Sequence, residues 1–203
     1  AMSALPSIKA QARARHQRDR ILEAAQQCFI EHGFHAASMS NIATTAKMSA
    51  GLIYRYFDSK SAIVLAIIAR QLEDNRANIA SLRSDPDLGR RIIELFSGWR
   101  TRDPSVTNAA LTLEMSAHAT RDPQVAAALL EADRITGAEF MAWLRERAVQ
   151  AGKDPDDRAL RARTLALKAF IEGLAVRAVR EPDLDALVAQ AAVELLLPLM
   201  TFE

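Results

Sequence analysis

The chain has 203 residues and a mass of 22.3 kDa; half of its residues are hydrophobic, a quarter are charged, and the net charge is +1. This composition excludes intrinsic disorder, and the aliphatic stretch at 62–69 is far too short to span a bilayer. A single cysteine, Cys28, excludes an internal disulfide framework, and we expect a cytoplasmic protein with no membrane partner. Residues 1–60 hold eight Lys or Arg against four acids, whereas the remainder holds 18 against 21. This imbalance predicts a polyanion partner for the first segment, unless it is simple scatter.

Apolar residues recur at spacings of three and four throughout the chain, and no window alternates as a half-buried strand would. With only seven glycines and seven prolines, the sequence predicts an all-α fold of about nine helices. They are expected at 15–32, 39–46, 50–57, 60–82, 87–102, 105–119, 122–151, 156–180 and 183–200. Gly33 is the expected stop of the first helix, and Asp-Pro or Glu-Pro pairs near 103, 122, 154 and 181 mark later starts.

Residues 38–57 predict two short helices joined by a tight turn. Ser38 and Ser49 are suited to cap the first and the second helix. The apolar stripe of the pair consists of Met39, Ile42, Ala43, Ala46, Ile53, Tyr56 and Phe57. Small alanines allow the two helices to approach closely, which predicts a helix-turn-helix whose second helix has the size to enter the major groove of DNA.

From Arg18 to Ile63 the chain resembles the TetR family of bacterial one-component repressors. The residues at the family's spacing are Ile42, Ala43, Ala46, Ser49, Gly51, Tyr54, Phe57 and Lys60. The family usually has glycine where this chain has Lys47, so we expect a slightly strained turn without a change of fold. We predict a disordered tail at 1–12, and the resemblance implies a helix-turn-helix domain at 13–60 and a helical ligand-binding and dimerisation domain at 61–203.

The resemblance also implies which side chains contact DNA. Base edges would be faced by Leu52, Arg55 and Tyr56, and the fork of Arg55 matches O6 and N7 of guanine. Phosphates would be held by Ser38, Ser40, Ser49, Tyr54 and Lys60. Further contacts to phosphate or minor groove are open to Arg13, Arg15 and Arg18. Packing is the alternative for Tyr54, and a solvated face is the alternative for Arg15 and Arg18.

The last two predicted helices have thin polar faces, which predicts burial on two sides. One face of 156–180 carries Leu160, Thr164, Leu167, Ile171, Leu174 and Ala178, with Ala166, Ala169 and Gly173 allowing close approach. The stripe of 183–200 consists of Leu184, Leu187, Val188, Ala191, Leu195 and Leu199. We expect both helices to form a four-helix homodimer interface across a two-fold axis; an ordinary monomeric core is the alternative.

A ligand cavity is implied by the resemblance, and its candidate lining lies between residues 87 and 180. The candidates are Phe96, Trp99, Leu111, Glu114, Met115, His118, Phe140, Trp143 and Phe170. A carboxylate and an imidazole one turn apart among aromatic rings suit a cation or a hydrogen-bonding ligand. The alternative is that the aromatics are plain core, His118 a satisfied histidine and Glu114 a solvated residue. Residues 170–175 resemble repressors of choline and betaine metabolism, over too short a stretch to assign an effector.

Together these features predict a homodimeric repressor that leaves a pseudo-palindromic operator when a small molecule shifts the helix at 60–82. An enzyme is not supported, and no catalytic residue, metal site or cofactor is expected. Cys28 lies in an apolar stripe, and no two histidines share the spacing of metal ligands. A helix-turn-helix protein whose body binds another protein, or nothing, is the remaining alternative.

Overall fold

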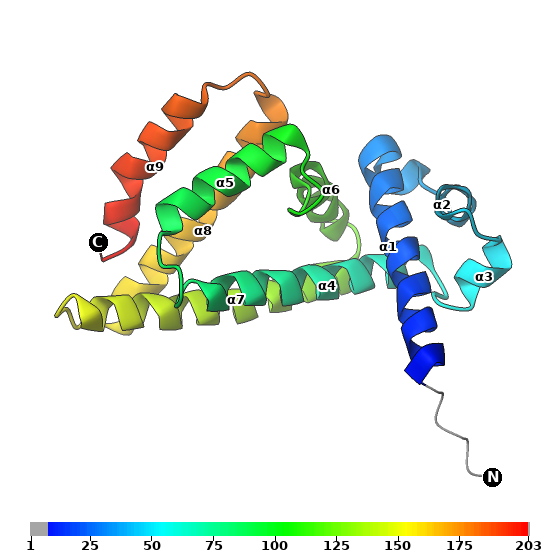
Figure 1. Ribbon diagram of the computed structural model, residues 1–203, viewed down its shortest axis with the longest axis horizontal. Coiled ribbons are helices and arrows are strands. Elements are labelled where there is room, and N and C mark those ends of the chain that lie inside the picture. The colour runs from blue at the N-terminus through cyan, green and yellow to red at the C-terminus, as the bar shows by residue number, and fades with distance from the viewer. Residues whose placement is uncertain (1–7, 203) are drawn as a thin grey trace, which may run out of the picture.

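The computed structural model describes residues 8–202, which form nine helices and no strand, so the predicted all-α fold is confirmed. The helices are α1 (Ile8–Ala36), α2 (Met39–Ala46), α3 (Ala50–Tyr54), α4 (Lys60–Ser81), α5 (Leu88–Thr101), α6 (Ala109–Ala119), α7 (Pro123–Gln150), α8 (Asp157–Arg180) and α9 (Ala186–Met200). Figure 1 shows α1–α3 gathered at one end, while α4 runs into the body beside α7. Within residues 8–202, no helix has both the length and the apolar character needed to cross a membrane.

Helix α1 departs most from the prediction. It begins at Ile8, so residues 8–12 of the expected disordered tail are helical, and residues 1–7 lie outside the described part of the chain. The segment 9–15 consists largely of alanine, glutamine and arginine, whose helix propensity extends α1 without an apolar stripe. At the other end, Gly33 adopts non-helical angles (φ 74, ψ 161) and interrupts the helix, as predicted.

Several later boundaries are set by polar caps rather than by the prolines. Helix α6 begins at Ala109 and not at 105, because the side chain of Asn108 accepts hydrogen bonds from the first turn. The preceding residues form a loop in which the Asp103 carboxylate accepts from the N–H of Ser105 at 2.8 Å. Helix α9 likewise begins late, after the cap Asp185. A side chain that satisfies the free N–H groups fixes a helix start more strongly than a nearby proline.

Two groups of buried side chains form the interior of the described residues. The first joins α1–α4 with Leu111 and Met115 of α6 and Val125 of α7. The second joins the end of α4 with α5, α7, α8 and α9 around Trp143, which is 1% exposed. Helix α6 therefore contributes its apolar side chains to the same core as the helix-turn-helix, although the sequence prediction places it in the body.

The two C-terminal helices divide their apolar residues between the inside and the outside of the chain. On α8 the predicted face with Leu160, Thr164, Leu167, Leu174 and Ala178 is buried within the same chain, and it therefore accounts for one of the two sides on which burial is expected. On α9 the predicted stripe is largely exposed, with Leu187 at 73%, Val188 at 57%, Leu195 at 72% and Leu199 at 69%. On α8, Leu165 is 71% exposed, and Ala166, Ala169 and Gly173 are exposed too. Each of the two helices therefore carries apolar side chains that no other part of the described chain covers.

The turn between α2 and α3 contains the strain that the sequence predicts. Lys47 adopts left-handed angles (φ 54, ψ 47), and its N–H donates to the carbonyl oxygen of Thr44 at 3.1 Å. For a residue with a Cβ atom this conformation costs roughly 1–2 kcal/mol.

We expect Lys47→Gly to raise the free energy of unfolding by roughly 0.5–1 kcal/mol, because relief of the strain outweighs the greater freedom of glycine in the unfolded chain. Urea denaturation at constant pH measures this difference. Arg102, which also has a positive φ (55), serves as the comparison: Arg102→Gly is expected to stabilise in the same way. A loss of stability in Lys47→Gly would contradict the assignment of strain to this turn.

Candidate nucleic-acid interface and the joint behind it

The helix-turn-helix is held together by buried apolar side chains at predicted positions. These are Ile42, Ala43, Ala46, Ile53 and Phe57. Each of its two helices begins at a serine cap: Ser38 Oγ accepts from the N–H of Asn41 at 3.1 Å, and Ser49 Oγ accepts from the N–H of Leu52 at 3.2 Å. Because these caps satisfy N–H groups that have no partner inside the helix, the local sequence determines where α3 starts.

The outer surface of α3 is open to solvent. Tyr54 is 51% exposed, and Arg55, the C-cap of the helix, is exposed as well. A side chain added at Gly51 would meet nothing within 4 Å, so another backbone can approach this surface closely. Leu52 and Tyr56 are half-buried at its edge. In Figure 1, α3 lies at the opposite end of the molecule from α9, with no other helix in front of its outer side.

The three serines predicted to hold phosphate are all exposed, but they are not equally free. The hydroxyl of Ser38 accepts from Asn41 N–H and also donates to the side-chain oxygen of Asn41. Its hydroxyl proton is therefore already used in a hydrogen bond within the protein. The hydroxyl of Ser49 accepts in its cap and keeps a proton to donate. Ser40 is exposed on the first turn of α2, where N–H groups at a helix start also attract an anion.

Two arginines of α1 hold the helix-turn-helix in place. Arg18 donates from Nη1 to the carbonyl oxygen of Tyr56 at 3.2 Å, and its guanidinium lies 4.3 Å from the centroid of the Phe57 ring. Arg20 donates from Nη2 to the carbonyl oxygen of Ala46, the last residue of α2, at 2.8 Å. Sequence reasoning assigned Arg18 to DNA or solvent and did not single out Arg20, because these acceptors are carbonyl groups far away in sequence.

Lys60, predicted to hold a phosphate, is engaged inside the protein. Its Nζ donates to the carbonyl oxygens of Phe34 at 2.6 Å and Ala37 at 2.8 Å, and lies 4.3 Å from the centroid of the Phe34 ring. Burial lowers the pKa of this ammonium group below its ordinary value. Since the two carbonyls follow the break in α1 and Lys60 is the first residue of α4, these bonds join the two helices.

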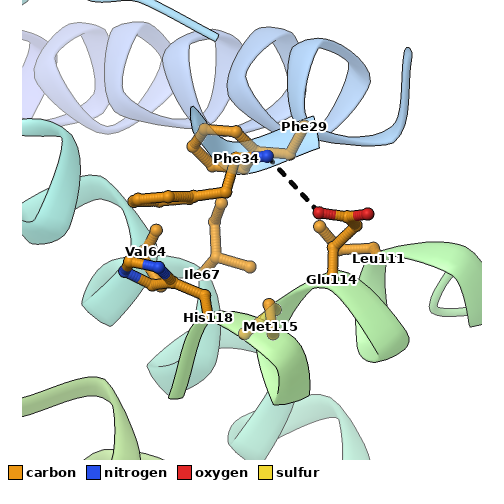
Figure 2. Close-up of a pocket in the computed structure, with 8 residues that line it drawn as sticks. All are labelled: Phe29, Phe34, Val64, Ile67, Leu111, Glu114, Met115 and His118. Carbon is orange, nitrogen blue, oxygen red and sulfur yellow. Dashed lines mark hydrogen bonds between the residues drawn. The ribbon is translucent and has the colours of Figure 1, made fainter. Parts of the chain in front are cut away.

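Behind the DNA-binding end, Phe34, Glu114 and His118 form a joint between α1 and α6 (Figure 2). The ring of Phe34 stacks on the imidazole of His118, with centroids 3.5 Å apart and planes inclined by 28°. The N–H of Phe34 donates to Glu114 Oε2 over a long 3.4 Å. His118 is 8% exposed, and neither of its ring nitrogens forms a hydrogen bond. The nearest polar atom to Nε2 is Oδ2 of Asp122, at 3.3 Å.

A cavity of about 10 Å³ lies against this joint, which is room for about one water molecule. It is lined by Phe29 and Phe34 of α1, Val64 and Ile67 of α4, and Leu111, Glu114, Met115 and His118 of α6. Four of the nine residues predicted for a ligand pocket are among these. The other five, Phe96, Trp99, Phe140, Trp143 and Phe170, belong to the second core or pack against it. The structure does not bring the nine together, because helical spacing alone does not tell which of two cores a side chain joins.

The second of the two short helices is capped, exposed on its outer side and supported by a buried apolar core. This is the arrangement of DNA-binding regulators of the helix-turn-helix class. The family model described as bacterial regulatory proteins, tetR family, matches residues 21–67. The HTH-type transcriptional regulator UidR of Escherichia coli (strain K12) is 36% identical over 149 residues, which cover 72% of this chain and 74% of UidR. The chain therefore belongs to the TetR family of transcriptional regulators, and it is not an enzyme.

Solved structures agree with this assignment. Salmonella enterica GusR has a TM-score of 0.66 at 27% identity, over 88% of this chain and 93% of its own. A chain from Saccharomonospora viridis in complex with choline has a TM-score of 0.69 at 20% identity, over 91% of this chain and 96% of its own. At that identity the second likeness shows the fold alone.

We expect Lys60→Met to lower the free energy of unfolding by about 1–3 kcal/mol, because two carbonyl groups lose a charged donor. Chemical denaturation measures the loss, and Lys9→Met on the exposed part of α1 is the control, expected to change stability little. If Lys60 served only to hold phosphate, its replacement would weaken DNA binding and leave the denaturation midpoint of the free protein unchanged.

Proposed function

We propose that the protein is a cytoplasmic, homodimeric repressor that leaves its operator when a small molecule binds behind the DNA-binding end. One observation carries the proposal: α3 presents Tyr54 and Arg55 to solvent, while α6 of the body packs into the core that supports α3. The DNA-contacting surface and the helix nearest the cavity thus share one set of buried side chains. A change at one is expected to alter the affinity at the other.

The proposed DNA contacts follow from exposure and from the bonds already made within the chain. Base edges are assigned to Arg55 and Tyr56, with Leu52 beside them, and phosphates to Tyr54, Ser40 and Ser49. Arg13 and Arg15, exposed on α1, are assigned to phosphate or minor groove. Ser38, Arg18 and Lys60 are assigned instead to positioning the helices, because their polar atoms are bonded inside the protein.

Dimerisation is proposed through the uncovered surface of α8 and α9. Large exposed leucines, Leu165, Leu187 and Leu195 among them, carry an apolar surface of the kind that marks interfaces. Exposed alanines and Gly173 on α8 allow a partner helix to approach closely. A two-fold axis through this surface would place two copies of α3 at the far ends of the dimer. These would meet half-sites separated by about one helical turn of DNA, or a multiple of it.

Release is proposed to pass through α6 and α4. Helix α4 begins at Lys60, directly after the helix-turn-helix, and is joined to α7 through Arg76–Glu139 at 2.6 Å and, just after its end, through Arg83–Glu146 at 2.8 Å. A ligand that displaces α6 from the shared core would therefore move α4 and change the spacing of the two recognition helices. Only a ligand that binds the displaced state more tightly produces this effect.

The first experiment is a mobility shift with DNA from the region upstream of the protein's own gene. At low salt we expect a retarded band, and Arg55→Ala is expected to reduce discrimination between the operator and scrambled DNA by about 1–3 kcal/mol. Arg15→Ala is the matched control: loss of a phosphate contact weakens binding to both DNAs alike and reduces the salt slope by about one. Equal loss of discrimination in the two variants would contradict these roles.

For the dimer, we expect Leu195→Glu to yield monomers in sedimentation equilibrium and to abolish operator binding, because a charge is forced into an apolar interface. Leu130→Glu changes a leucine that is equally exposed (71%) but lies on α7, and it is expected to remain dimeric. If the Leu195→Glu variant remained dimeric, the proposed interface on α8 and α9 would be wrong.

A further inference from the structure

We propose that the cavity between α1 and α6 is a closed effector site for a neutral aromatic molecule that carries a hydroxyl group, and that Phe34 occupies the place of that ring in the closed state. The inference rests on the proposed function and adds to it a location, a class of ligand and the side chain that the ligand displaces. It is built on three features of the joint: unmet polar groups, the small size of the cavity and the mobility available to Phe34.

The first feature is that His118 is buried without a hydrogen bond at either ring nitrogen. Asp122 lies nearest, with Oδ2 3.3 Å from Nε2, so this carboxylate faces that nitrogen although the pair lacks the geometry of a hydrogen bond. Its Oδ1 accepts from the N–H groups of Gln124 and Val125 at the start of α7, and the Val125 bond lowers the pKa of the carboxyl below its usual range. The hydroxyl of Ser61 points at Oδ2 over 3.4 Å. With Nε2 facing Asp122, Nδ1 is the ring nitrogen of His118 that remains for a ligand.

The second polar group is Glu114, which lines the cavity and is only partly buried. It accepts one long bond, from the N–H of Phe34, which leaves lone pairs free for a donor such as a hydroxyl. Figure 2 shows this carboxylate on the same side of α6 as the stacked rings of Phe34 and His118. With Asp122 also close to His118, a negatively charged ligand would meet two carboxylates.

The size of the cavity decides how a ligand enters. At about 10 Å³ it holds no molecule larger than water, so a side chain must leave first. The other apolar lining residues are held in the core, as shown by Phe29 at 1%, Ile67 at 0% and Leu111 at 0% exposed. Phe34 is only half-buried and follows Gly33, where α1 is interrupted at positive φ. Phe34 is therefore the lining side chain that can move without unpacking a helix.

The surroundings of Phe34 define the ligand that can replace it. Its ring is stacked on the imidazole of His118, and the ammonium of Lys60 lies 4.3 Å from its centroid. Both neighbours favour a flat aromatic ring, and the ammonium disfavours a cationic one. A hydroxyl on such a ring would donate to Glu114, taking over from the weak bond of the Phe34 N–H. Carboxylates and amines are expected to be rejected, and phenols accepted.

Ligand entry would also act on DNA binding. Displacement of Phe34 removes the ring beneath Lys60 and disturbs the carbonyl of Phe34 that Lys60 binds at 2.6 Å. Since Lys60 begins α4, the tie between the two helices behind the recognition surface is loosened. The coupling is reciprocal, so operator DNA must weaken ligand binding by the same factor.

The site is tested on the full chain with phenol, toluene and benzoate as probes, using calorimetry and operator binding. Wild-type protein is expected to bind phenol at millimolar concentration more tightly than toluene, and benzoate not at all. Phe34→Ala is expected to bind phenol roughly tenfold more tightly, because no phenylalanine ring has to leave the site before the ligand enters. Phe34→Leu, a milder change, is expected to lie between the two and replaces Phe34→Ala if that variant does not fold.

Two further variants serve as controls. Glu114→Met in the Phe34→Ala background keeps the length of the side chain and removes the acceptor, so the preference for phenol over toluene should vanish. Phe96→Ala opens a space of the same size in the second core, where Phe96 is 2% exposed. It should show no preference for phenol and no change in operator affinity.

Equal phenol affinity in wild type and Phe34→Ala, or equal binding of phenol and benzoate, would overturn the proposed site. Failure of the wild-type protein to retard operator DNA would instead overturn the proposed function, since calorimetry reads the site without DNA. Phenol binding that leaves operator affinity unchanged would overturn the coupling through Lys60.

Discussion

The position of the DNA-binding end relative to α4 depends on the hydrogen bonds that the ammonium group of Lys60 donates. This ammonium supplies donors to two carbonyl oxygens, of Phe34 and Ala37, that follow the break in α1, and it does so from the first residue of α4. Arg18 and Arg20 act similarly, binding carbonyl oxygens at the ends of α3 and α2. Cations near helix C-termini are favoured by the helix dipole as well as by the bonds. Part of the basic excess in the first 60 residues therefore holds helices together rather than DNA.

A consequence is that the DNA-binding end and the body are not separate units joined by a linker. Leu111 and Met115 of α6 lie in the core that supports α3, and α4 extends from that core along α7. The ion pairs that join α7 to α4 and to the residue just after it are open to solvent on at least one side and contribute little each. Shared apolar burial must supply most of the coupling, and packed cores respond by switching between arrangements rather than by bending.

The sequence predicts the parts of the structure that are decided locally. The caps at Ser38 and Ser49, the buried positions of α2 and α3 and the positive φ at Lys47 all depend on residues within a few positions of each other. The division of nine candidate ligand residues between two cores, and the choice of helices that the apolar face of α8 packs against, were not predictable, since both depend on which helices meet. The roles of Lys60 and Arg20 were missed for the same reason: their acceptors lie 23 to 26 residues away along the chain.

The missing hydrogen bonds of His118 affect how easily a ligand can open the joint between α1 and α6. A buried polar group without a partner destabilises the state that contains it by roughly 1–3 kcal/mol. The apolar and ring contacts of Phe34 stacked on His118 therefore have to offset the free energy lost to the missing hydrogen bonds. An open joint in which Nδ1 of His118 found a hydrogen-bond partner would recover that cost, which narrows the free-energy gap between the closed and the open joint. A ligand of modest differential affinity is then sufficient to shift the equilibrium, since its apparent affinity equals its affinity for the open state multiplied by the fraction of molecules that are open.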